Sequence, residues 1–166
     1  MVDIQEFRNG MAMLSGAVNV ITTAGPEGLA GFTATAVCSV TDQPPTLLVC
    51  MNRSSYAHRF FTGNGVLCVN LLGGDQQALS GLFADRNVTM EERFVRTPWQ
   101  ALATGSPALT DALVNFDCRI AQTHDIGSHS IFYCEVERVR QGDLRAGLVY
   151  FNRNYHRVGE EIRLAG

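Results

Sequence analysis

Seven consecutive residues in the first third of the chain combine small side chains with hydroxyl and thiol groups. They are Thr33, Ala34, Thr35, Ala36, Val37, Cys38 and Ser39. On an extended strand, the odd-numbered members would share one face and the even-numbered members the other. Small side chains let a strand backbone approach a flat polar heterocycle, whose edge can then bond to backbone N–H and C=O groups. An ordinary half-buried strand has the same composition, so the pattern leaves both interpretations open.

A second candidate site lies where an apolar strand gives way to a predicted helix. It consists of Asn52, Arg53, Ser54 and Ser55. Free N–H groups at the start of a helix, two hydroxyl groups and one guanidinium group suit the binding of a single phosphate. A simple helix cap with a solvated arginine is the alternative interpretation.

A third candidate site joins two segments that are far apart in the chain. The first is Gly127-Ser128-His129, and the second runs from Tyr150 to His156 and includes Tyr155. Histidine and tyrosine offer hydrogen bonds and stacking surfaces to an aromatic ligand. A histidine in a loop is, however, often only a surface residue or a residue satisfied within the core.

Composition excludes several classes of function. The chain has 166 residues, of which 46% are apolar and 17% charged, with a net charge of −3, and all its basic residues except the four histidines are arginines. The absence of lysine excludes Schiff-base chemistry and a Walker-type phosphate site. The small net charge and the absence of a basic cluster argue against nucleic acid as a partner. We expect a single globular domain over residues 1–166.

The sequence gives no sign of a membrane or an export route. No apolar run reaches the length of a membrane span, and the first ten residues lack the basic start and apolar stretch of a signal peptide. A cytoplasmic location is therefore predicted. The five cysteines are odd in number and lie mostly in apolar surroundings, which predicts buried free thiols with Cys38 as the exception. Their spacing does not predict a metal site.

The elements that must position these residues can be read from hydrophobic spacing. Phe7, Met11, Leu14 and Val18 recur at helical intervals, which predicts a short N-terminal helix with one packed face. Predicted strands, separated by turn residues, cover 17–23, 30–40, 46–51, 66–72, 112–125, 130–141 and 147–152. Predicted helices begin after residue 52 and within residues 76–94. Because helices and strands do not alternate regularly, we expect a mainly β protein, a β-barrel with flanking helices.

Several motifs of the chain resemble those of a known family, the short-chain flavin reductases. They are Ala17-Val18-Asn19-Val20-Ile21-Thr22-Thr23, the segment from Gly31 to Thr41, Leu67-Cys68-Val69-Asn70, Met90-Glu91-Glu92-Arg93-Phe94 and Gly127-Ser128-His129. The resemblance runs nearly from end to end. It is strongest to the family branches that serve 4-hydroxyphenylacetate hydroxylase and pyrimidine utilisation.

The resemblance implies a fold and a ligand arrangement. It implies a six-stranded split β-barrel of the FMN-binding type, and a homodimer with flavin sites near the subunit interface. Residues 33–39 would line the isoalloxazine ring of FMN, and residues 52–55 would hold its phosphate. Phe83-Ala84 would close over the flavin, and His129 and Tyr155 would meet the nicotinamide of NADH.

Two departures from the family pattern affect these expectations. The family often has Gly-Asp-His where this chain has Gly127-Ser128-His129, so a contact made by that aspartate is absent or replaced. Lysines that are common near the phosphate in the family are missing, which leaves Arg53 as the expected substitute.

The function that the resemblance implies is reduction of FMN by NADH or NADPH, with the reduced flavin passed to a partner monooxygenase. Flavin carries the electron chemistry, so the protein has only to bind, orient and exclude water. An alternative is a reductase of another acceptor, such as a ferric chelate or the cobalt of a corrinoid. A second alternative is a flavin- or haem-binding module without enzymatic activity. The sequence does not separate these alternatives.

Overall fold

The structure of the protein is a computed structural model that describes residues 1–162. Four helices lie in this part of the chain: α1 (Ile4–Met11), α2 (His58–Asn64), α3 (Gln77–Ala84) and α4 (Met90–Val95). The strands are β1 (Gly16–Ala17), β2 (Asn19–Thr23), β3 (Ala30–Ala34), β4 (Val37–Asp42), β5 (Pro45–Asn52), β6 (Val66–Leu71), β7 (Trp99–Ala101), β8 (Pro107–Leu109), β9 (Val114–Ile126), β10 (His129–Gln141), β11 (Gly147–Phe151) and β12 (Asn154–Val158).

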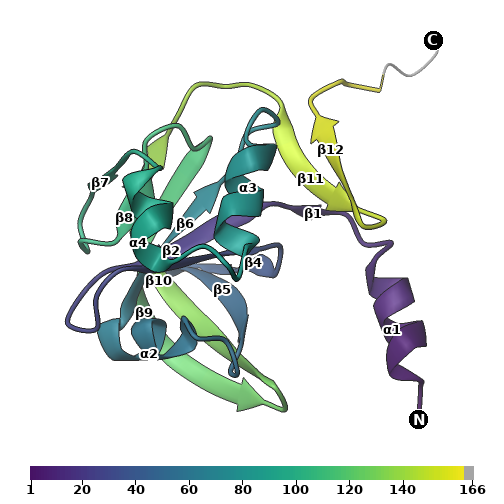
Figure 1. Ribbon diagram of the computed structural model, residues 1–166, viewed down its shortest axis with the longest axis horizontal. Coiled ribbons are helices and arrows are strands. Elements are labelled where there is room, and N and C mark those ends of the chain that lie inside the picture. The colour runs from purple at the N-terminus through teal and green to yellow at the C-terminus, as the bar shows by residue number, and fades with distance from the viewer. Residues whose placement is uncertain (163–166) are drawn as a thin grey trace.

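Seven strands form the main antiparallel sheet, in the order β3-β2-β6-β9-β10-β5-β4. Strands β3 and β4 follow one another in the chain but lie at opposite ends of this order, so the sheet curls into a barrel that stays open between them (Figure 1). The expectation of a mainly β, barrel-like fold with flanking helices is confirmed. No helix among residues 1–162 is long and apolar enough to cross a membrane.

The chain leaves strand geometry within residues 30–40, where the sequence predicts a continuous strand. Residues 30–40 form two strands, because pairing ends at Ala34 and resumes at Val37 with a different neighbour. Strand β3 pairs with β2, and β4 pairs with β5, so Thr35 and Ala36 cross the open side of the barrel. The expected alternation over residues 33–39 is therefore wrong beyond this crossing.

The barrel interior is filled by apolar side chains from the sheet and from α2. Phe61 of α2 packs edge-on against Phe32, with ring centroids 5.3 Å apart, and lies parallel to Phe132. Three of the cysteines, Cys68, Cys118 and Cys134, are buried free thiols as predicted. Burial raises the pKa of the Cys134 thiol to about 12, so it stays protonated. Cys50 is half-buried, and Cys38 is exposed.

Helices α3 and α4 lie against β3, and one glycine permits this close packing. A Cβ atom at Gly31 would lie 2.7 Å from Cε1 of Phe83 in α3 and 3.2 Å from Cζ of Phe94 in α4. The buried guanidinium of Arg93 fastens the same region. It donates to the carbonyl oxygens of Gly31 and Asp85 at 2.7 and 2.6 Å.

We predict that Gly31→Ala destabilises the protein, because the new methyl group overlaps the Phe83 ring. Overpacking of this kind costs roughly 1–3 kcal/mol, or about 2–12 °C in Tm, as thermal unfolding would measure. Gly81→Ala in α3 is the control, because no atom lies within 4 Å of its Cβ position. It should leave Tm unchanged or raise it slightly. Equal Tm values for both variants would contradict this account of the packing.

The two ends of the described chain form an arm beside the barrel (Figure 1). Strands β1, β11 and β12 make a three-stranded sheet, and α1 is joined to it by hydrogen bonds from Asn152 N to Ala12 O and from Arg153 Nη2 to Asn9 Oδ1. Helix α1 has a complete capping box but no buried residue. The expected packed face has no partner among residues 1–162. The helix ends at Met11, and Phe7, Met11 and Leu14 are exposed.

Candidate functional site

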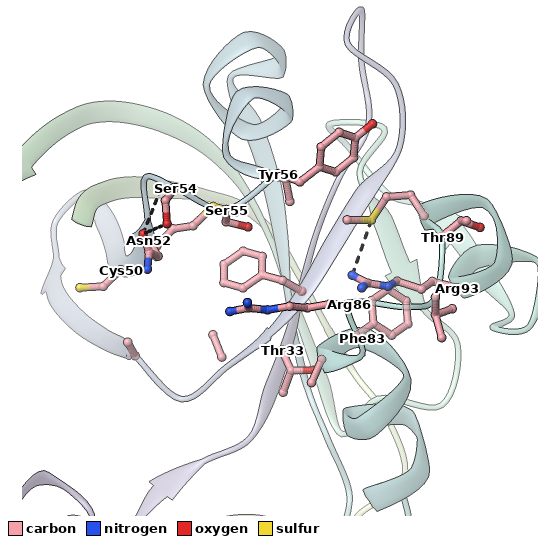
Figure 2. A pocket seen from close by; sticks show the side chains of 18 of the residues that line it. Thr33, Cys50, Asn52, Ser54, Ser55, Tyr56, Phe83, Arg86, Thr89 and Arg93 are labelled. Carbon is pink, nitrogen blue, oxygen red and sulfur yellow. Dashed lines mark hydrogen bonds between the residues drawn. The ribbon is translucent and has the colours of Figure 1, made fainter. Parts of the chain in front are cut away.

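A cavity lies where the barrel is open, between the β3–β4 crossing, the β5–α2 loop and the α3–α4 segment (Figure 2). Its volume is about 1030 Å³. The side chains around it come from segments widely separated in sequence: Phe32, Thr33, Ala34, Thr35, Ala36, Cys50, Met51, Asn52, Ser54, Ser55, Tyr56, Ala57, Phe83, Ala84, Arg86, Asn87, Val88, Thr89, Met90, Glu91, Arg93 and His129. Most members of the first two predicted sites, as well as His129, thus meet at one place.

The strand wall of the cavity has hydrogen-bonding groups to offer. Strand β3 pairs only with β2, so the groups on its other edge have no strand partner among the described residues. The hydroxyl of Thr33 donates to the carbonyl of Ser80 in α3 at 2.7 Å, which ties this wall to the helix opposite. The small residues that follow, Thr35 and Ala36, leave the backbone exposed. This wall can therefore receive the polar edge of a flat ligand.

Three members of the predicted strand lie outside the cavity. Beyond the crossing, Val37, Cys38 and Ser39 belong to β4 and line a separate hollow of about 280 Å³ with Leu47 and Phe116. The structure therefore divides residues 33–39 between two surfaces, because the chain changes its strand partner between Ala34 and Val37.

The β5–α2 loop forms a polar corner of the cavity. The side-chain oxygen of Asn52 accepts hydrogen bonds from the backbone N–H and the hydroxyl of Ser54, at 2.9 and 2.8 Å. Helix α2 begins only at His58, and its N-cap is Ala57, which makes no side-chain cap bond. The alternative interpretation of residues 52–55 as a simple helix cap is therefore wrong. The two serines instead present their hydroxyl groups along a turn, where Ser54 and Ser55 line the cavity (Figure 2).

Arg53 points to the hairpin between β9 and β10. Its guanidinium lies 3.5 Å from Asp125 and donates to the carbonyl of Gly127 at 3.3 Å, and the residue is not among those around the cavity. Arg86, from the α3–α4 loop, does line the cavity. Figure 2 shows its guanidinium extending across the cavity toward the side of Cys50 and Asn52. Arg93, the other cavity arginine, is held by backbone carbonyls.

A chain of hydrogen bonds fixes the loop that carries His129. The buried hydroxyl of Ser130 donates to Asp125 at 2.6 Å and lies 2.8 Å from Nε2 of His58. Because its proton goes to Asp125, the hydroxyl accepts from His58 Nε2–H. The Ser130 hydrogen bond, together with the positive charge of Arg53, lowers the pKa of Asp125. These hydrogen bonds connect the start of α2 to the β9–β10 hairpin. They therefore fix the position of His129 relative to the polar corner.

His129 and Tyr155 are not brought together. His129 lies at the cavity edge as the first residue of β10, and its Nδ1 is 2.8 Å from the Ser128 hydroxyl. Tyr155 lies in β12, away from the cavity, and its hydroxyl is 2.7 Å from Ser80 Oγ. The structure thus joins His129, but not Tyr155, to the cavity. Phe83 and Ala84, at the end of α3, form the wall opposite the polar corner.

Comparison with known proteins assigns the chain to a family. The flavin reductase like domain matches residues 11–159, most of the chain. The chain belongs to the flavin reductase-like family. Among its relatives is the FMN reductase (NADH) RutF of Pantoea ananatis, 55% identical over 161 residues, which cover 97% of this chain and 84% of the relative.

Solved structures show that this fold recurs in the flavin reductase family. A protein of Haemophilus somnus 129PT is 48% identical, with a TM-score of 0.91 over 95% of this chain and all of its own. The styrene monooxygenase flavin reductase of Pseudomonas putida S12 is 26% identical, with a TM-score of 0.84 over 95% of this chain and 99% of its own. The resemblance to flavin reductases and the split-barrel fold are confirmed.

The cavity fits the flavin that this family name implies. Its strand wall offers unpaired edge groups for a ring, its polar corner offers two hydroxyl groups, and Arg86 supplies a positive charge for a phosphate. Sequence reasoning did not identify Arg86, although it directly follows the Phe83-Ala84-Asp85 segment in a loop between two helices. Tyr56, Cys50 and the α4 residues around the cavity were also missed, because strand and helix spacing gives no sign of their convergence.

Proposed function

We propose that the protein reduces FMN with NADH and releases the reduced flavin to a partner monooxygenase. The observation that carries the proposal is the cavity of about 1030 Å³ at the open side of the barrel, with neutral strand residues on one side and hydroxyl and guanidinium groups on the other. Relatives of the chain carry out NADH-dependent FMN reduction, as their name states. The reaction would take place in the cytoplasm, where NADH is regenerated.

The residues of the cavity would divide the work of binding between them. The backbone from Thr33 to Ala36 would bond to the pyrimidine edge of the ring, and Phe83 would pack against the opposite side of the cavity. The hydroxyl groups of Ser54 and Ser55 and the guanidinium of Arg86 would hold the single phosphate. Bound FMN would supply the hydride-accepting ring. The chain itself would exclude water and fix the approach of the nicotinamide, with His129 at the edge of the cavity.

NADH oxidation, followed by absorbance, tests this function directly. The protein with NADH and FMN should oxidise NADH in multiple turnovers, faster with FMN than with FAD, because the polar corner provides for one phosphate. Air should reoxidise the released flavin in the absence of a partner. Stoichiometric FMN binding without turnover would contradict the proposal and favour a binding module. Turnover only with a ferric chelate or a corrinoid would reassign the acceptor.

We also propose that the protein is a homodimer in which the arms of the two chains pack against each other. An eight-residue helix with no buried side chain is marginal by itself, yet Phe7 in α1 and Leu14 just after it are 57% and 65% exposed. A second copy is the occupant that we infer, because a two-fold contact would bury both arms at once. A dimer would enclose the apolar arm without a foreign protein.

The dimer proposal predicts a large effect of Phe7→Ser combined with Leu14→Ser. Each lost side chain removes roughly 1.5–3 kcal/mol of burial in each copy, so dimer affinity should fall by about 10⁴-fold or more. Sedimentation of the wild type and the variant over a range of concentrations measures this. The matched control is Val95→Ser, an exposed apolar residue on α4. A monomeric wild type at micromolar concentration would overturn the proposal.

A further inference from the structure

An exposed aromatic ring stands at the rim of the cavity, on the β5–α2 loop. Tyr56 lines the cavity, yet the residue is 66% exposed. Figure 2 shows its ring at the upper edge of the group of lining side chains. A large aromatic side chain with this exposure contributes little to the core. Its place at the mouth of a ligand cavity therefore calls for a contact with a ligand.

Neighbouring side chains hold the Tyr56 ring in place. Its centroid lies 5.5 Å from that of the buried Phe60, and the guanidinium carbon of Arg59 lies 5.3 Å from the Tyr56 centroid and 4.6 Å from that of Phe60. Arg59 Nη2 also donates to the tyrosine hydroxyl at 3.3 Å. A ring fixed in this way loses little conformational freedom when a second ring stacks on it.

The charge of Arg59, which lies beside Tyr56 but not among the residues around the cavity, is not neutralised within the described part of the chain. Among residues 1–162, the ion pairs join Arg53, Arg119 and Arg145 to carboxylates, and no carboxylate lies within ion-pair distance of Arg59. Arg86 adds a second guanidinium inside the cavity. An exposed π-face next to an unpaired guanidinium suits a ligand with both a heteroaromatic base and a phosphate.

The size of the cavity leaves room for such a ligand beside FMN. Pockets for single small molecules occupy about 300–1,000 Å³, and this cavity of about 1030 Å³ slightly exceeds that range. The strand wall and the polar corner provide for the ring and phosphate of FMN. Neither of these features includes Tyr56 or Arg59, which follow Ser55 by one and four residues.

We propose that Tyr56 and Arg59 form a subsite for the adenosine diphosphate moiety of a dinucleotide, with the adenine stacked on Tyr56 and the diphosphate beside Arg59. NADH is the dinucleotide that the proposed function supplies, and the inference rests on that function. FAD carries the same moiety and is the other source. The subsite would increase the affinity for the hydride donor without touching the reacting atoms, which is the task of a specificity-determining residue.

Comparison of NADH with reduced nicotinamide mononucleotide, which lacks the adenosine half, tests the subsite. With FMN at a fixed saturating concentration, Tyr56→Leu should lower kcat/KM for NADH by about 5- to 100-fold, as expected for a lost stacking contact. It should leave kcat/KM for the mononucleotide unchanged. Arg59→Gln should have a smaller effect in the same direction, and Tyr56→Phe should retain wild-type values. Tyr133→Leu, on β10 outside the cavity, is the matched control.

Two further measurements show whether NADH or FAD supplies the bound moiety. They also distinguish a failure of the subsite from a failure of the proposed function. If Tyr56→Leu raises KM for FAD but not for FMN, with the mononucleotide as donor, the moiety bound is that of FAD and the subsite stands. Equal losses with NADH and the mononucleotide, or no loss with NADH or FAD, would overturn the subsite. Calorimetric titration with ADP-ribose needs no turnover. Weaker binding by Tyr56→Leu than by wild type would uphold the subsite even if the proposed reductase activity failed, and equal binding would reject it.

Discussion

Replacement of Arg86 by alanine is expected to weaken FMN binding by about 10- to 100-fold. The guanidinium extends into the cavity toward the polar corner (Figure 2), and a charge-assisted contact to a phosphate contributes roughly 1.5–3 kcal/mol. The loss should be specific to the phosphate. Riboflavin, which has the same ring without a phosphate, should bind the variant and the wild type equally. Quenching of flavin fluorescence measures both affinities.

Arg53→Ala provides the matched comparison, because it removes the same charge from the neighbouring loop. Its guanidinium pairs with Asp125 at the surface, with both side chains about half exposed, and such pairs contribute little. FMN affinity should therefore change by less than about threefold, and the variant should keep its Tm. If Arg53→Ala weakened FMN binding and Arg86→Ala did not, the phosphate would lie at Arg53, as the sequence led us to expect.

The strands of the barrel were predictable because their side chains obey local rules. Buried runs such as Leu47-Leu48-Val49 and turn residues such as those at Gly25-Pro26 are read within a window of a few residues. Which strands pair with one another was not predictable in this way. The break between Ala34 and Val37 depends on which strands lie beside them, and a sequence with strand character on both sides of the break gives no local signal for it.

The site shows the same limit more sharply. Asn52, Ser54 and Ser55 were found because hydroxyl and amide groups follow a buried strand directly. Arg86 and Arg53 cannot be told apart in this way, since both are arginines in short loops. What separates them is an ion pair between Arg53 and Asp125, which are 72 positions apart, and this contact exists only in the folded chain. The sequence therefore pointed to Arg53, whereas the arginine that the fold brings to the cavity from a loop between helices is Arg86.

The N-terminal helix illustrates a different limit. Its apolar spacing at Phe7, Met11 and Leu14 predicts a packed face but not its partner, because amphipathic spacing indicates that a face is to be buried and not what buries it. The same spacing is consistent with burial against a second copy. Periodicity alone cannot distinguish a core from an interface, since both are apolar surfaces removed from water.

His129→Ala is expected to lower kcat/KM for NADH by about 10- to 100-fold while FMN affinity stays within about twofold of wild type, since small misplacements of reacting groups are this costly. His129 is held at the cavity edge, at the first position of β10, by the hairpin that Ser130 and Asp125 brace. Its position at the edge, rather than on the strand wall, places it where the nicotinamide would enter. Stopped-flow reduction of bound FMN by NADH measures the hydride step directly.

The comparison with Ser130→Ala tells a positioning role from a direct contact. That variant removes the hydrogen bonds that link His58 to Asp125 but does not remove the imidazole of His129. If His129 itself meets the nicotinamide, His129→Gln, which keeps a hydrogen-bonding side chain, should recover part of the reduction rate, and Ser130→Ala should lose less than His129→Ala. If only the hairpin conformation matters, Ser130→Ala should lose as much, and His129→Gln should show no recovery. A parallel loss of FMN affinity in His129→Ala would instead place the residue in the flavin pocket, and an unchanged reduction rate would remove it from the nicotinamide site.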